Sequence, residues 1–340
     1  MRRGLGQFLG FLALATCGLL AGPAGHSATS ATSATDTAAL DGLGRREAFV
    51  HDPSTLLRVG DTWWLFATGR GVSVWRSADR TRWERAGSVF SETPSWVTGV
   101  VPGQRGHFWA PDVVRVRDRV LLYFSVSSFG KNTSAIALAS SPVAVTGSGE
   151  TGFAWKDEGV VVRSRAGDDY NAIDPSLLLD RDGRLWMAFG SFWGGIQLCE
   201  LDPLTGRSKA PQPGLRRVAW KKEIEAPALH RRGDWYYLFV NWGFCCRGAD
   251  STYEVRVGRS REVVGPYVDR DGEGLLEGGG TLFLATEGSF IGPGHVGWLE
   301  DGGEEWVSVH FYDGTQNGKA TLAIRRLTWT DDGWPVAGGR

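Results

Sequence analysis

The stretch Ile173-Asp174-Pro175-Ser176, followed after a polar turn by Leu185-Trp186-Met187-Ala188-Phe189, decides the fold because the chain repeats its pattern. Each copy has Pro or Gly next to an acidic residue or His, then a polar turn and an aromatic-rich strand. The copies start roughly 50 to 70 residues apart, which is the range of a propeller blade. The other four copies are His51-Asp52-Pro53-Ser54, Trp109-Ala110-Pro111-Asp112, Glu225-Ala226-Pro227-Ala228 and Gly292-Pro293-Gly294-His295.

The pattern between these motifs is that of an all-β chain. No segment after residue 45 has sustained helical periodicity, and short runs rich in Val, Trp, Tyr and Phe end at Gly, Asp and Asn turns. A β-sandwich does not repeat one motif at each sheet, whereas a propeller does. The sequence therefore predicts a five-bladed β-propeller over residues 45–335, with equivalent motif positions converging on one axis.

Composition and the N-terminal region indicate an exported protein. The 340 residues carry a net charge of -1 without a basic block, so nothing indicates a nucleic-acid partner or an anionic membrane surface. Residues 1–28 read as a signal peptide whose apolar run is too short for a comfortable membrane span. Residues 29–44 are a Ser/Ala/Thr repeat that predicts a disordered linker. We therefore expect a secreted monomer that has no membrane attachment after signal cleavage.

The cysteines leave their pairing open. Once Cys17 is removed with the signal peptide, Cys199, Cys245 and Cys246 remain. An odd count leaves at least one thiol unpaired or intermolecular. The adjacent Cys245 and Cys246 could form a vicinal disulfide, or Cys199 could reach one of them.

Acidic residues recur at one place in the repeat. A single Asp-Pro is more often a turn residue than a functional one. Here Asp52 and Asp174 both stand in Asp-Pro-Ser, and we expect Glu225 to take the corresponding place in a third repeat. Carboxyl groups crowded at a propeller axis raise at least one pKa. Glycoside hydrolysis needs that asymmetry, because one carboxyl must be protonated and another ionised.

The ordered set of motifs resembles glycoside hydrolase family 43, specifically its inverting endo-1,5-α-L-arabinanases, whose fold is a five-bladed β-propeller. The resemblance extends from about Ala48 to Trp329. Besides the five repeat motifs, it rests on Asn171-Ala172, Gly190-Ser191-Phe192-Trp193-Gly194-Gly195, Cys245-Cys246-Arg247-Gly248 and Asp250-Ser251-Thr252-Tyr253.

The resemblance implies a role for each acid. Asp52 would be the general base that deprotonates the attacking water, and Glu225 would be the general acid at the glycosidic oxygen. Asp174 would orient that acid and tune its pKa. The substrate would be arabinan or arabino-oligosaccharide.

The resemblance also implies a cation, usually calcium, at His295 on the axis. A lone His is more often structural, and calcium prefers oxygen ligands, so such a site would be completed largely by water.

Several weaker candidates for substrate binding surround these residues. In a gapless match of the second repeat to the fourth, Trp109 rather than Asp112 occupies the slot of Glu225, so Trp109 is expected to face the cavity and Asp112 to serve packing or a turn. Trp96 lies in a long segment where aromatic loops could line sugar subsites. Asn171, Ser191 and Thr252 match polar positions near the substrate site of the resembled family.

Two alternatives to endo-acting hydrolysis stay open at this point. An exo-acting α-L-arabinofuranosidase or β-xylosidase would use the same scaffold, and loops closing one end of the cleft would distinguish it. A non-catalytic glycan-binding propeller is disfavoured, because such a module has no need of three crowded carboxyl groups.

Overall fold

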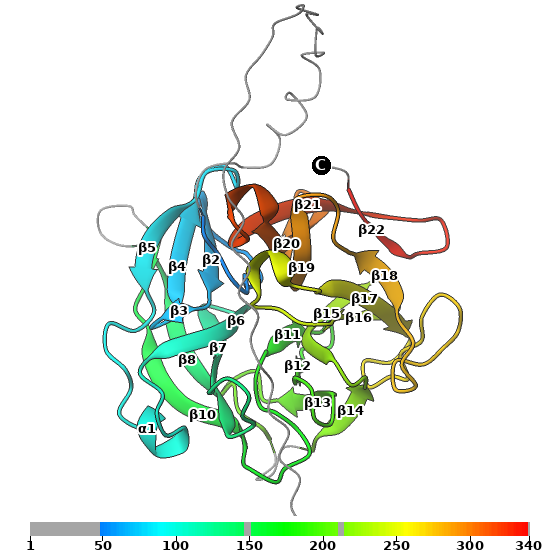
Figure 1. The fold of residues 1–340 in the computed structure, drawn as a ribbon. Coiled ribbons are helices and arrows are strands. Elements are labelled where there is room, and N and C mark those ends of the chain that lie inside the picture. Colours follow the sequence, from blue (N-terminus) through cyan, green and yellow to red (C-terminus); the bar gives the residue numbers. More distant parts are fainter. Residues whose placement is uncertain (1–47, 146–150, 210–213, 339–340) are drawn as a thin grey trace, which may run out of the picture. The chain divides into compact units, whose positions relative to one another are not determined.

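The computed structural model describes residues 48–145, 151–209 and 214–338, all of them in the compact unit Ala39–Arg340. These residues form five antiparallel sheets placed around a common axis (Figure 1). The predicted five-bladed β-propeller is therefore confirmed. The predicted signal peptide (1–28) and linker (29–44) lie outside the described residues, so they stay predictions. Across the described ranges, no helix is long and apolar enough to cross a membrane.

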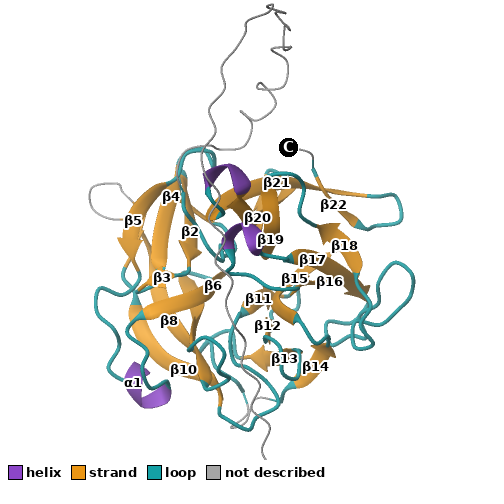
Figure 2. Cartoon of the chain, in the orientation of Figure 1, coloured by secondary structure: helices purple, strands orange, loops and turns teal. Residues whose placement is uncertain are grey.

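Apart from one two-residue strand, each blade is built from strands that follow one another in the chain, and the first long strand of a blade lies near the axis (Figures 1 and 2). The first blade contains β1 (Leu57–Val59), β2 (Thr62–Ala67), β4 (Ser73–Ser77) and β5 (Glu84–Ser88). The second contains β6 (His107–Val116), β7 (Arg119–Val126), β8 (Ser134–Val145) and β10 (Lys156–Ser164), with β3 (Gly69–Arg70) paired to β6 and β9 (Thr151–Phe153) paired to β8.

The remaining three blades have four strands each. The third contains β11 (Ser176–Leu179), β12 (Leu185–Phe189), β13 (Ile196–Leu201) and β14 (Arg216–Ala219). The fourth contains β15 (Ile224–Arg232), β16 (Trp235–Trp242), β17 (Glu254–Ser260) and β18 (Thr281–Leu284). The fifth contains β19 (Phe290–Asp301), β20 (Glu304–Asp313), β21 (Lys319–Trp329) and β22 (Pro335–Ala337). The described helices are short: α1 (Val97–Val100), η2 (Gly248–Asp250) and η3 (Gly314–Gln316).

The hydrophobic core lies between neighbouring blades. In β2 the side chains of Trp64 and Phe66 pack toward the second blade, whereas Trp63 and Leu65 join a cluster with Leu299 of the fifth blade. Successive side chains of a strand point to opposite faces, so a strand buried on both faces is a continuous apolar run. This explains why the aromatic strands of the repeat do not alternate with polar residues.

Polar groups connect the blades near the axis. The buried carboxylate of Asp112 accepts hydrogen bonds from the backbone N–H groups of Thr55 (3.0 Å) and Leu177 (2.8 Å), which belong to the first and third blades. Ser176 Oγ accepts the backbone N–H of Leu229 in the fourth blade at 2.9 Å. Asp112 therefore has the structural role that the sequence predicts.

The ring closes between the fifth and first blades. The Leu56 N–H donates to the Trp298 carbonyl at 2.7 Å, and the Ser308 hydroxyl donates to the Ser54 carbonyl at 3.1 Å. Gly297 lies at this junction, where a Cβ would stand 2.2 Å from the Ser54 oxygen. A side chain at position 297 would therefore separate the two blades.

Candidate active site

One residue per blade has a left-handed backbone at the inner end of the repeat motif. These residues are Asp52 (φ 52°), Ala110 (φ 40°), Asp174 (φ 59°), Ala226 (φ 51°) and His295 (φ 22°). In blades two, four and five they lie where the register of the innermost strand shifts. A bulge of this kind redirects a side chain, and Asp tolerates positive φ better than most residues. The repeat thus presents Asp52, Asp174 and His295 from equivalent backbone positions.

Glu225 does not share that position, so the predicted correspondence of Glu225 with Asp52 and Asp174 is wrong by one residue. Ala226, not Glu225, has the left-handed backbone. The register shift that follows Glu225 in β15 matches the shift that follows Trp109 in β6. The gapless match of Trp109 with Glu225 is therefore confirmed.

Asp52 is held by the first and fifth blades. Its Oδ2 accepts the Thr68 hydroxyl at 2.6 Å and lies 2.8 Å from His51 Nδ1. Its backbone N–H donates to His310 Nδ1 at 3.1 Å. Two donors therefore occupy Oδ2, and Oδ1 is nearest to His310 Nδ1 (3.6 Å) and His295 Nδ1 (4.0 Å).

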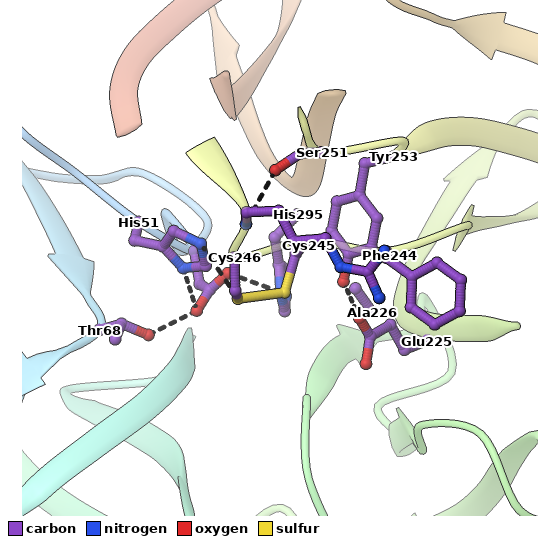
Figure 3. The surroundings of a disulfide bond; sticks show 12 residues. His51, Thr68, Glu225, Ala226, Phe244, Cys245, Cys246, Ser251, Tyr253 and His295 are labelled. Carbon is purple, nitrogen blue, oxygen red and sulfur yellow. Dashed lines mark hydrogen bonds and ion pairs between the residues drawn. A yellow bond between two sulfur atoms is a disulfide. The ribbon is translucent and has the colours of Figure 1, made fainter. Parts of the chain in front are cut away.

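Glu225 is held by the third and fourth blades. The Ser191 hydroxyl donates to its Oε2 at 2.8 Å, and the Tyr253 hydroxyl donates to its Oε1 (Figure 3). Asp174 lies beside it, because Asp174 Oδ2 accepts the backbone N–H of Ala226 at 3.2 Å. The Asp174 N–H itself donates to Ser125 Oγ at 2.9 Å.

The surroundings shift the pKa values of the acids in opposite directions. Burial would raise the pKa of Asp52, but the charge and hydrogen bond of His51 and the nearby His310 hold it well below its ordinary value. Burial raises the pKa of Glu225, against the hydrogen bonds from Tyr253 and Ser191. Burial together with Glu225 and Asp52 raises the pKa of Asp174 well above its ordinary value. The cluster thus favours the ionised form of Asp52 and the protonated forms of Glu225 and Asp174.

His295 lies in the cluster, as its place in the fifth repeat predicts. Its side chain is buried, and burial lowers its pKa. The described residues around Asp52 offer mainly imidazole nitrogens, and the combination with metal-ligand spacing is His51, Asp52 and His310. Calcium prefers oxygen ligands. This donor set fits calcium only if water supplies nearly all ligands, and calcium at His295 stays a prediction.

The predicted substrate-binding residues fall into different places. Ser191 contacts the acid Glu225 directly. Asn171 is buried, and its Oδ1 has no hydrogen-bond partner within the described part of the chain. Thr252 Oγ1 accepts the backbone N–H of Phe244 at 3.1 Å, which pins the loop that carries the cysteine pair. Trp109 is half-buried at the bulge.

The contacts of Trp96 are with the core and with a surface acid, and not with the three carboxyl groups of the cluster. It packs against the core between the first and second blades, and its Nε1 donates to Asp157 Oδ2 at 2.8 Å. These contacts give it a structural explanation, and a role at a sugar subsite stays a prediction.

Sequence reasoning missed five side chains that contact or orient the acids. They come from different places in the chain: Thr68 follows β2, Tyr253 ends the Asp250–Tyr253 motif before β17, and His310 and Tyr312 lie in β20, the second strand of the last blade. His51 stands next to Asp52 in the first motif and could have been found there. Its ring stacks on His310 with centroids 4.1 Å apart.

Cys245 and Cys246 form a vicinal disulfide, whereas Cys199 is a buried free thiol. Cys246 Sγ lies 3.8 Å from His51 Nε2, which places the disulfide at the edge of the cluster (Figure 3). The structure thus decides between the two pairings that the sequence leaves open.

Known proteins share this architecture. The family model for glycosyl hydrolases family 43 matches residues 46–335. An extracellular exo-α-(1→5)-L-arabinofuranosidase of Cellvibrio japonicus is 40% identical over 305 residues, covering 86% of this chain and 87% of the relative. An extracellular endo-α-(1→5)-L-arabinanase of Bacillus subtilis is also 40% identical over 305 residues, with coverages of 86% and 88%.

A solved structure of an arabinanase is also similar to this chain. The α-L-arabinanase of Cellvibrio cellulosa in complex with arabinohexaose has a TM-score of 0.81 and 38% identity, and the match covers 86% of this chain and 96% of that one. With a propeller of five blades, a buried cluster of three acids and a family match over nearly the whole described region, this chain belongs to glycosyl hydrolases family 43 and is a glycoside hydrolase.

Proposed function

We propose that this enzyme is a secreted, inverting endo-1,5-α-L-arabinanase that cleaves internal α-1,5-L-arabinofuranosidic bonds of arabinan. One observation carries the proposal: a single cluster holds Asp52 against His51 and Thr68 and buries Glu225 beside Asp174. These surroundings lower the pKa of Asp52 and raise the pKa of Glu225. An ionised base and a protonated acid at the same pH are what glycoside hydrolysis requires. The names of the relatives support arabinan as substrate and export as destination.

Asp52 acts as the general base. Because Thr68 and His51 both donate to Oδ2, the lone pairs of Oδ1 are left to accept a proton from water. The resulting hydroxide-like oxygen attacks the anomeric carbon from the face opposite the leaving group, and the configuration inverts.

Glu225 acts as the general acid. Its proton passes to the glycosidic oxygen as the bond to the anomeric carbon breaks, so the departing sugar leaves as a neutral alcohol. Ser191, after β12 of the third blade, and Tyr253, before β17 of the fourth, each hold one carboxyl oxygen of Glu225. Asp174 contacts the backbone next to this acid through the Ala226 N–H, and burial raises the pKa of both acids.

Endo action is the finer part of the proposal. The exo-acting and endo-acting relatives are equally identical to this chain. The arabinohexaose complex of the Cellvibrio cellulosa enzyme supports a cleft that accommodates an oligosaccharide. The alternative is exo-acting α-L-arabinofuranosidase activity on the same scaffold.

Digestion of linear 1,5-α-arabinan tests the proposal. Products are separated by chromatography at early times, and their anomeric configuration is followed by NMR. Mixed oligosaccharides with inverted configuration support endo action. Arabinose alone supports the exo alternative, and retained configuration rules out the proposed mechanism. Light scattering on the purified protein tests the expected monomer.

A further inference from the structure

A continuous chain of hydrogen bonds joins the vicinal disulfide to Asp52. The backbone N–H of Cys246 donates to the Tyr312 hydroxyl oxygen at 2.7 Å. That oxygen lies 2.8 Å from His51 Nε2, and His51 Nδ1 lies 2.8 Å from Asp52 Oδ2. This series of hydrogen bonds thus runs from the loop after β16, through Tyr312 in β20 of the fifth blade, to the first motif.

The kinds of group involved determine the donor in each of these hydrogen bonds. A backbone N–H can only donate, so the Tyr312 oxygen accepts from Cys246. Asp52 is the ionised acceptor, so the His51 Nδ1 carries a hydrogen. In a neutral ring Nε2 then has the lone pair and accepts the Tyr312 O–H. Against burial, the charge and hydrogen bond of Asp52 raise the pKa of His51, and in a protonated ring Nε2–H donates to the Tyr312 oxygen instead. Burial raises the pKa of Tyr312, so its hydroxyl keeps that hydrogen.

Two contacts select this orientation of the His51 ring, that of Nδ1 with Asp52 and that of Nε2 with Tyr312. The ring stacks on His310 with an interplanar angle of 21°. Stacking fixes the plane of the ring, but a half-turn about its bond to Cβ preserves the plane and exchanges the positions of nitrogen and carbon. The Cys246 sulfur, 3.8 Å from Nε2, is a weak hydrogen-bond partner. Tyr312 is therefore the group that distinguishes Nε2 from the carbon that would replace it.

The disulfide restrains the first donor of the chain. A bond between adjacent cysteines closes a small ring that includes the peptide bond leading to the Cys246 nitrogen. Thr252 holds the same loop through two hydrogen bonds with Phe244, at 2.9 Å and 3.1 Å. The Ser251 hydroxyl also interacts with Tyr312 and accepts the Arg247 N–H at 3.1 Å. The Cys246 amide is therefore presented to Tyr312 from a doubly restrained loop.

We propose that Tyr312, oriented by the backbone amide of disulfide-bonded Cys246, is a positioning residue that keeps the His51 Nδ1–H on Asp52 and thereby leaves Oδ1 of Asp52 free for water. This inference rests on the proposed role of Asp52 as general base. Tyr312 acts through His51 and does not touch the substrate.

The first test is steady-state hydrolysis of linear arabinan by Tyr312→Phe. We expect kcat to fall about 10- to 100-fold, because small displacements of a reacting group have effects of that size, while KM stays within about twofold. Tyr237→Phe is the matched control: its buried hydroxyl donates to the Gly333 carbonyl at 2.5 Å, away from the acids. Wild-type kcat in Tyr312→Phe would overturn the proposal.

The second test couples the disulfide to Tyr312. We expect the Cys245→Ser/Cys246→Ser variant to lower kcat in the wild-type background and to have a much smaller effect in the Tyr312→Phe background, because both changes break one chain. Cys199→Ala controls for loss of a cysteine elsewhere. Fully additive effects on kcat would show that the disulfide does not act through Tyr312.

A third measurement does not depend on turnover or on the folding of a variant. NMR of ring ¹⁵N-labelled wild-type enzyme should show His51 protonated on Nδ1, with Nε2 bare when the ring is neutral. The opposite tautomer would overturn the proposal even if arabinan is hydrolysed. Conversely, an Nδ1–H signal in an enzyme that does not cleave arabinan would refute the proposed function while leaving the hydrogen-bond chain intact.

Discussion

The Ser191 hydroxyl donates to Glu225 Oε2 across 2.8 Å, so a residue at the end of the third blade holds the acid of the fourth. The contact coincides with an isolated β-bridge between the same two residues. The acid is therefore fixed by backbone pairing and by a side-chain bond. Because Ser191 influences the pKa of Glu225, the pH dependence of activity depends on the contact between these two blades.

The raised pKa of Glu225 predicts the alkaline limb of activity. As pH rises through that pKa, the acid loses its proton and kcat/KM falls, so the limb should lie above the ordinary Glu value of 4.5. Ser191→Ala removes a hydrogen bond that favours the ionised form, so the pKa of Glu225 should rise and the limb should move to higher pH. The pH profile of kcat/KM measures both.

Ser140→Ala is the matched control for this change. The Ser140 hydroxyl donates to Glu158 Oε1, also at 2.8 Å, in the second blade. Its pH profile should follow the wild type. An unchanged alkaline limb in Ser191→Ala would mean that Glu225 is not the titrating acid.

Substitution of the two acids should separate their roles. Glu225→Gln should lower kcat on arabinan by about 10²- to 10⁴-fold, yet nearly restore it on an aryl arabinofuranoside whose leaving group needs no proton. Asp52→Asn should be inactive on both substrates, because water must still be deprotonated. Parallel kinetics on polymer and aryl glycoside test this, and equal losses in Glu225→Gln on both substrates would contradict the assignment of the acid.

Asp112 should matter for stability and not for chemistry. Asp112→Ala leaves two buried backbone N–H groups, those of Thr55 and Leu177, without their acceptor. The cost should be about 2–6 kcal/mol in the free energy of unfolding, from about 1–3 kcal/mol for each group. Urea unfolding measures it, and kcat per folded molecule should stay at the wild-type value. A loss of kcat without a loss of stability would assign Asp112 to the active site.

The predicted calcium ion is tested by metal analysis of the purified protein and by chelation. If the ion binds at His295, the wild type should contain calcium that His295→Ala lacks, and EDTA should lower wild-type activity alone. His230→Ala is a suitable control, because that His lies in β15 and pairs with Glu305 of β20 at 2.8 Å. Equal calcium content in both variants would remove His295 from the site.

The repeat was sufficient to predict the fold and the convergence of Asp52, Asp174, Glu225 and His295, because equivalent positions in a ring must approach one axis. It placed Glu225 one residue too late, although the spacing to Pro227 already shows that Ala226 is the counterpart of Asp52 and Asp174. Tyr253, His310 and Tyr312 were not predictable in the same way. Their contacts join segments from different blades, and the local sequence around them reads as ordinary strand. Trp96 shows why loop aromatics are difficult to assign from sequence: it packs against a core, and its role at a sugar subsite stays a prediction.

Closure of the ring has a consequence for how the enzyme becomes active. The His310 nitrogen that receives the Asp52 N–H, and the bonds between Leu56 and Trp298, come from the last blade to be synthesised. The first blade alone therefore contains Asp52 but lacks the fifth-blade contacts that hold it in place. Fragments that lack the fifth blade should bind no productive water at Asp52, and hydrolytic activity should appear only when the first and fifth blades meet.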